Sequence, residues 1–146
     1  MRFMLMVKAN EDTEAGVPPT KEQLQGMLRL MEDMAKAGVL FGGDGLKPSS
    51  FGKRYKISGG KIVDVTDGPF AETKELLAGY ALVQVDSWEE LEKWTERFAE
   101  AQGDGEVEIR PLYEASDFIS ENFTPEDAAR EDALRRELAA RQSPGG

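Results

Sequence analysis

Two carboxylates and a cation near the middle of the 146-residue chain are best suited to chemistry, namely Asp67, Glu72 and Lys74. A carboxylate whose pKa is raised by partial burial serves as a general base, and a nearby cation stabilises the oxyanion or enolate that proton removal creates. This set suits proton abstraction next to a carbonyl, a decarboxylation or a lyase step on a small organic acid. Two further cations and a hydroxyl donor would bind the substrate: Arg54, Arg110 and Tyr80.

The segment Asp67-Gly68-Pro69-Phe70 also has the composition of a turn. The aspartate carboxylate accepts backbone N–H bonds, the glycine supplies an unusual dihedral angle and the proline fixes the next one. A structural role is therefore the default interpretation of these four residues. The candidate cations have an alternative as well, because lysine and arginine commonly serve only to keep a surface soluble.

The chain contains neither cysteine nor histidine, which removes thiolate nucleophiles, disulfides, the usual acid/base at neutral pH and the commonest transition-metal ligand. No carboxylate-rich loop of the calcium-binding type is present, so we predict no metal and no cofactor, with oxygen-ligated Mg²⁺ left open. A net charge of −10 repels phosphate backbones and anionic membranes. We therefore expect no nucleic-acid and no membrane partner.

The length and the 40% hydrophobic content suit one globular domain with its own core. We assign it to residues 1–118 and regard 119–146 as a charged helical tail. No apolar run is long enough for a membrane span, and the chain begins with a strand-like run in place of a signal peptide. These features predict a soluble, cytoplasmic protein.

The first half contains a strand over 2–8, a loop over 10–19 and a helix that begins at a capping box formed by Thr20 and Gln23. Gly38 is placed to end that helix. Six residues at helical spacing predict the face that packs on a sheet: Leu24, Met27, Leu28, Met31, Met34 and Ala35.

A short strand over 39–41 leads into Gly42-Gly43-Asp44-Gly45. This cluster lacks the ending of a phosphate-binding loop, so a turn or bulge with positive φ is the better explanation. Gly59-Gly60 then separates two alternating runs, 54–58 and 61–65, in the manner of an antiparallel hairpin.

After the central turn, a nearly continuous apolar run over 78–85 predicts a buried strand. Ser87 and Glu90 form a second capping box, and the helix that follows ends near Gly103. Alternating charged and apolar residues over 106–110 predict a strand with one wet face, ending at Pro111. The buried face of the helix is predicted from four large residues: Trp88, Leu91, Trp94 and Phe98.

The tail carries a helix from Thr124 to about Ala140, with Pro125 at its first position. Only Leu134 and Leu138 could anchor it, so it is either a solvated helix or a docking segment for a protein partner. Residues 143–146 are expected to fray.

This order of elements predicts an α+β, ferredoxin-like fold: an antiparallel sheet of βαβ-hairpin-βαβ type, two helices on one face and an extra C-terminal helix. Two helices cover one sheet face only, yet the strands over 2–8 and 78–85 are apolar on both faces. The same face of another copy would cover the second face. We therefore expect a homodimer formed through the sheet.

The run from Asp67 to Glu75 resembles the signature of DGPF-type proteins in the YCII-related family, and the segments 1–5, 38–45, 79–80 and 110–111 support the resemblance. It covers most of residues 1–118. The resemblance implies a dimeric ferredoxin-like α+β barrel with a cleft near the dimer interface. A His/Asp pair has been proposed as the catalytic apparatus of wider family members, and a chain without histidine departs from that pattern.

Two classes of function follow. One is a small enzyme acting on a small organic acid or carbonyl compound, with the candidate residues above as its site. The other is a non-enzymatic ligand-binding or regulatory module, because the resemblance implies a link to sigma factors of the extracytoplasmic-function kind. In that case the tail from Ser120 would contact the protein partner.

Overall fold

The computed structural model describes residues 1–118 and 120–142, which form two compact units. The first is Met1–Pro111, and the second begins at Leu112. The division predicted after residue 118 remains a prediction. The expected fraying over 143–146 lies outside the described residues.

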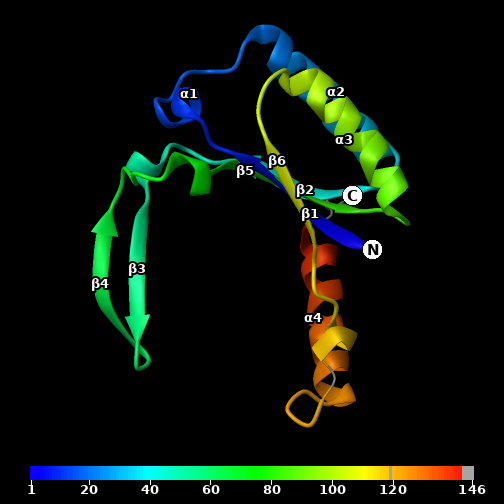
Figure 1. Ribbon diagram of the computed structural model, residues 1–146. Helices are drawn as coiled ribbons and strands as arrows, with labels where there is room; N and C mark the ends of the chain where they lie inside the picture. Colours follow the sequence, from blue (N-terminus) through cyan, green and yellow to red (C-terminus); the bar gives the residue numbers. More distant parts are fainter. Residues whose placement is uncertain (119, 143–146) are drawn as a thin grey trace. The chain divides into compact units, whose positions relative to one another are not determined.

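Four antiparallel strands form the sheet of the first unit, in the order β2-β5-β1-β6 (Figure 1). The strands are β1 (Arg2–Lys8), β2 (Leu40–Gly45), β5 (Leu77–Gln84) and β6 (Val107–Pro111). Helices α2 (Lys21–Lys36) and α3 (Trp88–Gln102) both lie on one face of this sheet. This order, with two crossover helices on one face, is the ferredoxin-like α+β arrangement that the sequence predicts.

The core lies between the helices and the sheet. Phe3 and Leu5 of β1 alternate with half-buried residues, and the facing positions of β5 and α3 supply Val83 and Leu91. The predicted α3 stripe is confirmed in its middle, since Trp94 and Phe98 pack on this core. Trp88 is half exposed, with its ring centroid 4.8 Å from that of Phe3.

The predicted buried stripe of α2 is wrong in part. Leu30 and Met34 are the buried residues of this helix, and Met27 packs against them. Leu24, Leu28 and Met31 are exposed, as is Ala35. The apolar side of the helix is therefore wider than the part that packs on the core.

That contact is close because Gly26 allows it: a Cβ at this position would lie 3.3 Å from the Cβ of Ala101. Beside it, the Gln23 side-chain amide donates to the Gln102 carbonyl at 2.8 Å. Both predicted helix stops are confirmed, since Gly38 and Gly103 have positive φ.

Two predicted irregular segments are ordered differently. The expected loop 10–19 contains the one-turn helix α1 (Glu11–Glu14), which begins at a capping box formed by Asn10 and Thr13. The Gly42–Gly45 cluster belongs to β2, whose pairing with β5 shifts register just before it, between Leu40 and Gly42, and none of its glycines has positive φ. Gly43 is required for another reason, because a Cβ there would lie 2.7 Å from the Tyr80 carbonyl oxygen of β5.

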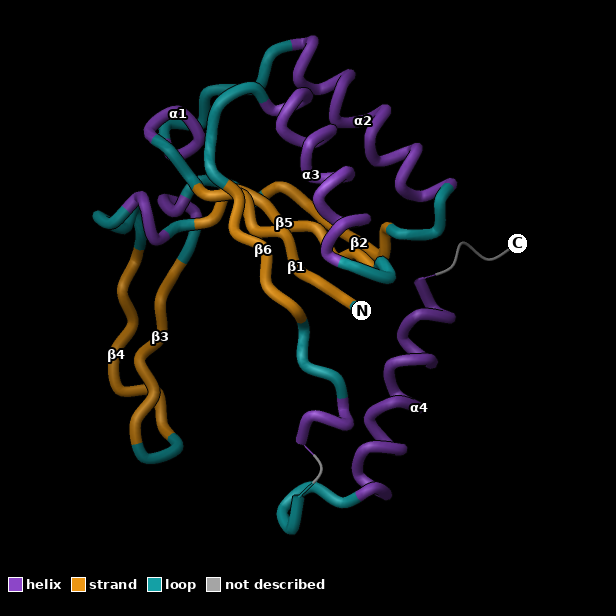
Figure 2. Tube along the Cα trace, turned by 45° about the vertical axis from the view of Figure 1, so that its right-hand side comes forward, coloured by secondary structure: helices purple, strands orange, loops and turns teal. Residues whose placement is uncertain are grey.

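The predicted hairpin is confirmed, with β3 (Lys53–Ser58) and β4 (Lys61–Asp67) joined by Gly59 and Gly60 at positive φ. It forms a separate two-stranded sheet. Figures 1 and 2 both show it projecting from one end of the main sheet, toward the side opposite α2 and α3. Every residue of both strands is exposed.

The second unit holds the predicted C-terminal helix as α4 (Pro125–Gln142). Thr124 and Asp127 form its capping box, and Pro125 occupies the first helical turn. The Tyr113, Phe118 and Phe123 rings pack in sequence ahead of the helix. Within the described residues, no helix has the length and apolar character needed to cross a membrane.

Candidate functional site

The central turn, Asp67–Phe70, folds back onto the segment before the hairpin. The Gly68 N–H donates to the Gly52 carbonyl at 3.0 Å, and the Gly68–Pro69 peptide bond is cis. A Cβ on Gly68 would lie 1.7 Å from the Ser49 carbonyl oxygen. Glycine is therefore required at position 68 because the backbone of Ser49 approaches it closely. The prediction that Gly68 supplies an unusual dihedral angle is wrong, because its φ is not positive.

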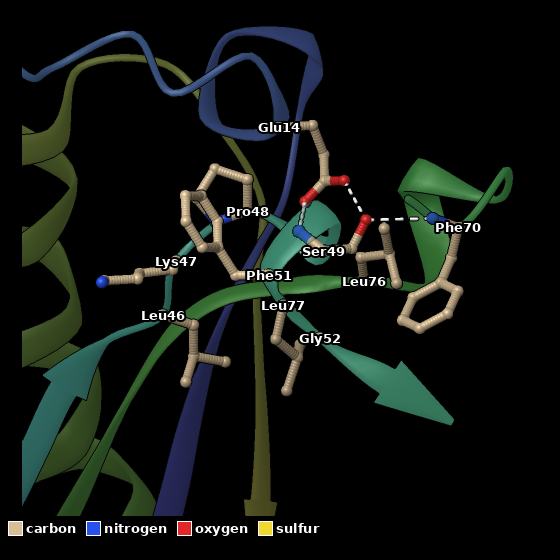
Figure 3. Close-up of a pocket in the computed structure, with 10 residues that line it drawn as sticks. All are labelled: Glu14, Leu46, Lys47, Pro48, Ser49, Phe51, Gly52, Phe70, Leu76 and Leu77. Atoms are coloured by element: carbon tan, nitrogen blue, oxygen red, sulfur yellow. Dashed lines mark hydrogen bonds between the residues drawn. The ribbon is translucent and has the colours of Figure 1, made fainter. Parts of the chain in front are cut away.

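Ser49 joins three segments that lie far apart in the sequence (Figure 3). Its backbone N–H donates to Glu14 Oε1 at 3.0 Å, and its hydroxyl donates to Glu14 Oε2. The same hydroxyl accepts the Phe70 N–H at 3.0 Å. One side chain thereby holds the end of α1, the 3-10 turn Ser49–Phe51 and the central turn together.

Local structure explains why Glu14 occupies this place. Asn10 and Thr13 fix the single turn of α1, and this turn presents Glu14 toward Ser49. Pro48 precedes the 3-10 turn and provides no side-chain cap. The Glu14 carboxylate supplies that missing cap from another segment, since a carboxylate is favourable at an exposed set of N–H groups.

A cavity of about 400 Å³ opens beside this pair. Its wall is mostly apolar, and Glu14 and Ser49 are its half-buried polar side chains. Lys47 also lines it, but Figure 3 shows the Lys47 ammonium extending away from Glu14, and it lies 5.1 Å from the Phe51 ring centroid. The remaining lining residues are Leu46, Pro48, Phe51, Gly52, Phe70, Leu76 and Leu77.

The hairpin and the cavity share a wall at Phe70. The Arg54 guanidinium of β3 stacks over the Phe70 ring at 3.9 Å from its centroid. Because β3 follows Gly52 directly and β4 ends at Asp67, the base of the hairpin is fixed by the same contacts that form the cavity.

The predicted catalytic residues do not line this cavity. Asp67 pairs with Lys53 Nζ at 3.0 Å, and its side chain is 76% exposed. Glu72 and Lys74 are exposed in and beside the 3-10 turn Thr73–Glu75. The β3–β4 register pairs Arg54 with Thr66, so Arg54 and Asp67 lie on opposite faces of the hairpin.

The two remaining predicted binding residues lie on the main sheet. Tyr80 is opposite Met6 and Arg110 is opposite Met4, so both belong to the face that carries neither α2 nor α3. Tyr80 is half-buried and Arg110 is exposed. The structure therefore separates the predicted set into a group at the hairpin base and a pair on the sheet.

Sequence reasoning did not find Glu14 and Ser49. They are 35 residues apart, and neither stands in a catalytic pattern. The available signal was the Asn10 to Thr13 spacing, which predicts a helix start and hence a fixed position for Glu14. Among the described residues, no group of three or more carboxylates is arranged to hold a metal ion.

Residues 1–116 match the model of the YCII-related domain. A solved structure, 5-chloro-2-hydroxyhydroquinone dehydrochlorinase (TftG) from Burkholderia phenoliruptrix AC1100 in complex with 2,5-dihydroxybenzoquinone, is 11% identical, with a TM-score of 0.43 over 80% of this chain and 98% of that chain. No curated protein sequence matches the chain.

Proposed function

This chain belongs to the YCII-related family, and we propose that it is a small enzyme that binds a compact carbonyl compound in the cavity beside Glu14 and Ser49 and transfers a proton there. One observation carries the proposal: a half-buried carboxylate is fixed by two hydrogen bonds in the wall of a mostly apolar cavity. A fixed carboxylate in such surroundings meets the geometric requirement for a general base.

Glu14 has the acceptor capacity that this role needs. An ionised carboxylate offers about four lone-pair sites, and the bonds from Ser49 use one on each oxygen. The remaining sites can accept a proton from a bound C–H or O–H acid. The Ser49 hydroxyl donates to Glu14 and accepts from Phe70, so it fixes the position of the base.

The composition of the wall indicates the class of substrate. Leucine, proline and phenylalanine side chains supply most of the surface, which favours a flat or branched apolar body. The Glu14 charge disfavours a second anion nearby, and the Lys47 ammonium points away from it. A neutral ketone or enol therefore fits better than a small organic acid.

Asp67, Glu72 and Lys74 remain a competing proposal for the catalytic set, with Arg54, Tyr80 and Arg110 as binding residues. Asp67 and Arg54 flank the base of the hairpin, close in sequence to Phe70 and Gly52 of the cavity wall. Their exposure and the Lys53 ion pair favour a supporting role over general base catalysis.

Deuterium exchange at carbon distinguishes the two sets. A panel of small ketones in D₂O, followed by ¹H NMR, reports proton abstraction without knowledge of the natural substrate. We expect Glu14→Gln to lower the exchange rate by about 100-fold, while Glu11→Gln on the exposed side of the same helix leaves it unchanged.

Loss of exchange in Asp67→Asn with normal exchange in Glu14→Gln would indicate that Asp67, and not Glu14, is the general base. An absence of exchange for the whole panel with the wild-type protein would contradict the enzymatic proposal.

A homodimer through the sheet face opposite α2 and α3, called the helix-free face, is part of the proposal. Half-buried Met4, Met6, Tyr80 and Leu82 occupy this face, and in Figure 1 neither α2 nor α3 covers it. Apolar residues on such a face favour contact with another apolar surface, and a second copy supplies one by two-fold symmetry.

The non-enzymatic alternative is a regulatory module, whose link to an extracytoplasmic-function sigma factor comes from the family resemblance. Exposed Leu134 and Leu138 of α4 offer a contact surface for such a partner. Their spacing places them on one side of a charged helix, as in helices that dock into a groove. Replacing both with glutamate should abolish partner binding and leave ketone exchange intact, whereas the matched pair Ala133→Glu and Ala140→Glu should change neither. Partner binding that survives the leucine replacements would contradict this alternative.

A further inference from the structure

The β3–β4 hairpin is two-faced, and its apolar face is uncovered. The register places Tyr55 opposite Val65 and Ile57 opposite Ile62, so these four side chains share one face. They are between 48% and 70% exposed. The other face carries the polar pairs Arg54–Thr66, Lys56–Asp64 and Ser58–Lys61, and the Lys53–Asp67 ion pair lies at the base of the apolar face.

A two-stranded sheet of this kind is marginally stable by itself and gains stability from packing of one face. The alternation of apolar and polar residues specifies which face is packed. A one-residue change of register would move the apolar side chains of one strand to the other face. The hairpin is thus organised to rest on a second surface. We infer that this surface belongs to a second copy of the chain, and that the hairpin is an arm that lies across the partner's body.

The direction of the arm supports a second copy as the occupant, an inference that rests on the proposed homodimer. Figures 1 and 2 both show the arm projecting to the side of the main sheet opposite α2 and α3. A copy that docks on the helix-free face therefore stands beside the arm, and two-fold symmetry places each arm against the other body.

The distribution of charge supports the same occupant. Residues 53–67 contain four cations and two carboxylates, a net charge of +2. Because the whole chain carries −10, the residues outside this segment carry −12. Two bodies of this charge repel each other, whereas a basic arm is attracted to an acidic body. The arm therefore supplies electrostatic complementarity that two sheet faces alone lack.

The size of the arm indicates that it contacts the partner's body and does not pair only with the partner's arm. Seven residues at about 3.4 Å each and a width of two strands give a face of about 240 Å². A stable interface buries about 800 Å² on each partner. Two arms packed only on each other fall short of this area, while an arm added to a sheet-face contact approaches it.

Two matched double variants test the arm. Ile57→Glu with Val65→Glu adds two negative charges to the apolar face, and Ser58→Glu with Thr66→Glu adds the same charge to the polar face. Sedimentation equilibrium of the full chain, with circular dichroism to confirm folding, gives the dimer dissociation constant. We expect the apolar-face variant to weaken the dimer by about 100-fold and the polar-face variant by less than about fivefold.

A third variant, Leu82→Glu on the helix-free sheet face, separates the arm from the dimer itself. If Leu82→Glu dissociates the dimer and the apolar-face variant does not, the sheet-face homodimer stands and the arm proposal is overturned. A wild-type protein that is monomeric at about 10 μM overturns both proposals. Assembly beyond a dimer that depends on Ile57 and Val65 also overturns the arm, because it indicates open edge-to-edge pairing.

Discussion

Strands β1 and β5 and strands β3 and β4 all carry large apolar side chains, but the surroundings of these side chains are opposite. Phe3 and Val83 on the main sheet are almost completely buried under two helices. Ile57 and Val65 on the hairpin are largely exposed, although the pairing of their strands is equally regular. Regular pairing therefore depends on backbone hydrogen bonds and turn geometry, whereas burial depends on which element is available to cover a face.

The difference assigns separate tasks to the two regions. The covered sheet provides the free energy that stabilises the first unit, since burial of apolar area is the dominant favourable term. The hairpin contributes little to that core, and its base is fixed by the Ser49 and Gly68 contacts that form the cavity. The region that is least buried is thus joined directly to the candidate site.

Matched side-chain truncations in the two strand pairs should give the largest difference in the free energy of unfolding. Val83→Ala in β5 should lower the free energy of unfolding by about 2–3 kcal/mol, because it leaves a cavity in a closed core. Val65→Ala in β4 should cost about 0.5 kcal/mol or less in dilute protein. Urea unfolding of both variants measures the difference, and equal losses would show that the hairpin is part of the same core.

The central turn should be almost as sensitive as the core. Gly68→Ala forces a methyl group into the Ser49 carbonyl and should destabilise the first unit by about 1–3 kcal/mol. Gly45→Ala is the control, since a Cβ there meets no atom within 4 Å and the residue has no positive φ. Thermal unfolding should shift only for Gly68→Ala. A neutral result would indicate that the turn is not held against Ser49.

Removal of the hydroxyl that joins the three segments should have a smaller effect. Ser49→Ala removes the hydroxyl bond to Glu14, keeps the backbone bond, and leaves the Phe70 N–H without its acceptor, at a cost of about 1–2 kcal/mol. Exposed Ser50→Ala should be neutral. Chemical denaturation gives both values. Equal stability of the two variants would mean that Ser49 does not anchor the cavity wall.

The smallest expected effect is a pH dependence of α4. Hydrogen bonds from the Thr124 backbone N–H and then its hydroxyl lower the pKa of Asp127, with Arg130 adding to them. A carboxylate with a lowered folded-state pKa contributes stability above its unfolded value of about 4, and that contribution is lost as the pH falls through the folded value. Helical circular dichroism should thus decline below about pH 4. Asp127→Asn should weaken this dependence, and an unchanged acid profile would exclude Asp127 as its source.

Local signals predicted much of the fold. The Thr20 to Gln23 spacing located the start of α2, and Gly59-Gly60 located the hairpin turn. The buried face of α2 was not predictable in the same way, because Leu24 and Leu28 are as apolar as Leu30. Leu30 follows Gly26 by one helical turn, and the close approach of Gly26 to Ala101 is a tertiary contact that helical spacing does not encode.

The candidate site was predictable only at its centre. The central turn is visible in the sequence, but Glu14 reaches Ser49 across 35 residues and no local pattern encodes that contact. A turn role was the default prediction for Asp67 and catalysis the alternative, and its exposed side chain pairs with Lys53. Gly68 was expected to supply an unusual dihedral, and its actual requirement is the space occupied by the Ser49 carbonyl.

Hydrogen exchange of the two strand pairs tests most directly the claim that a second copy covers the hairpin. Backbone amides of β1 and β5 should exchange slowly at every protein concentration, since the core of their own chain protects them. Amides of β3 and β4 should gain protection by about 10-fold or more between about 1 μM and about 100 μM protein as the arm becomes covered. Exchange of β3 and β4 that is fast and independent of concentration, in a protein that is dimeric throughout, would contradict the account.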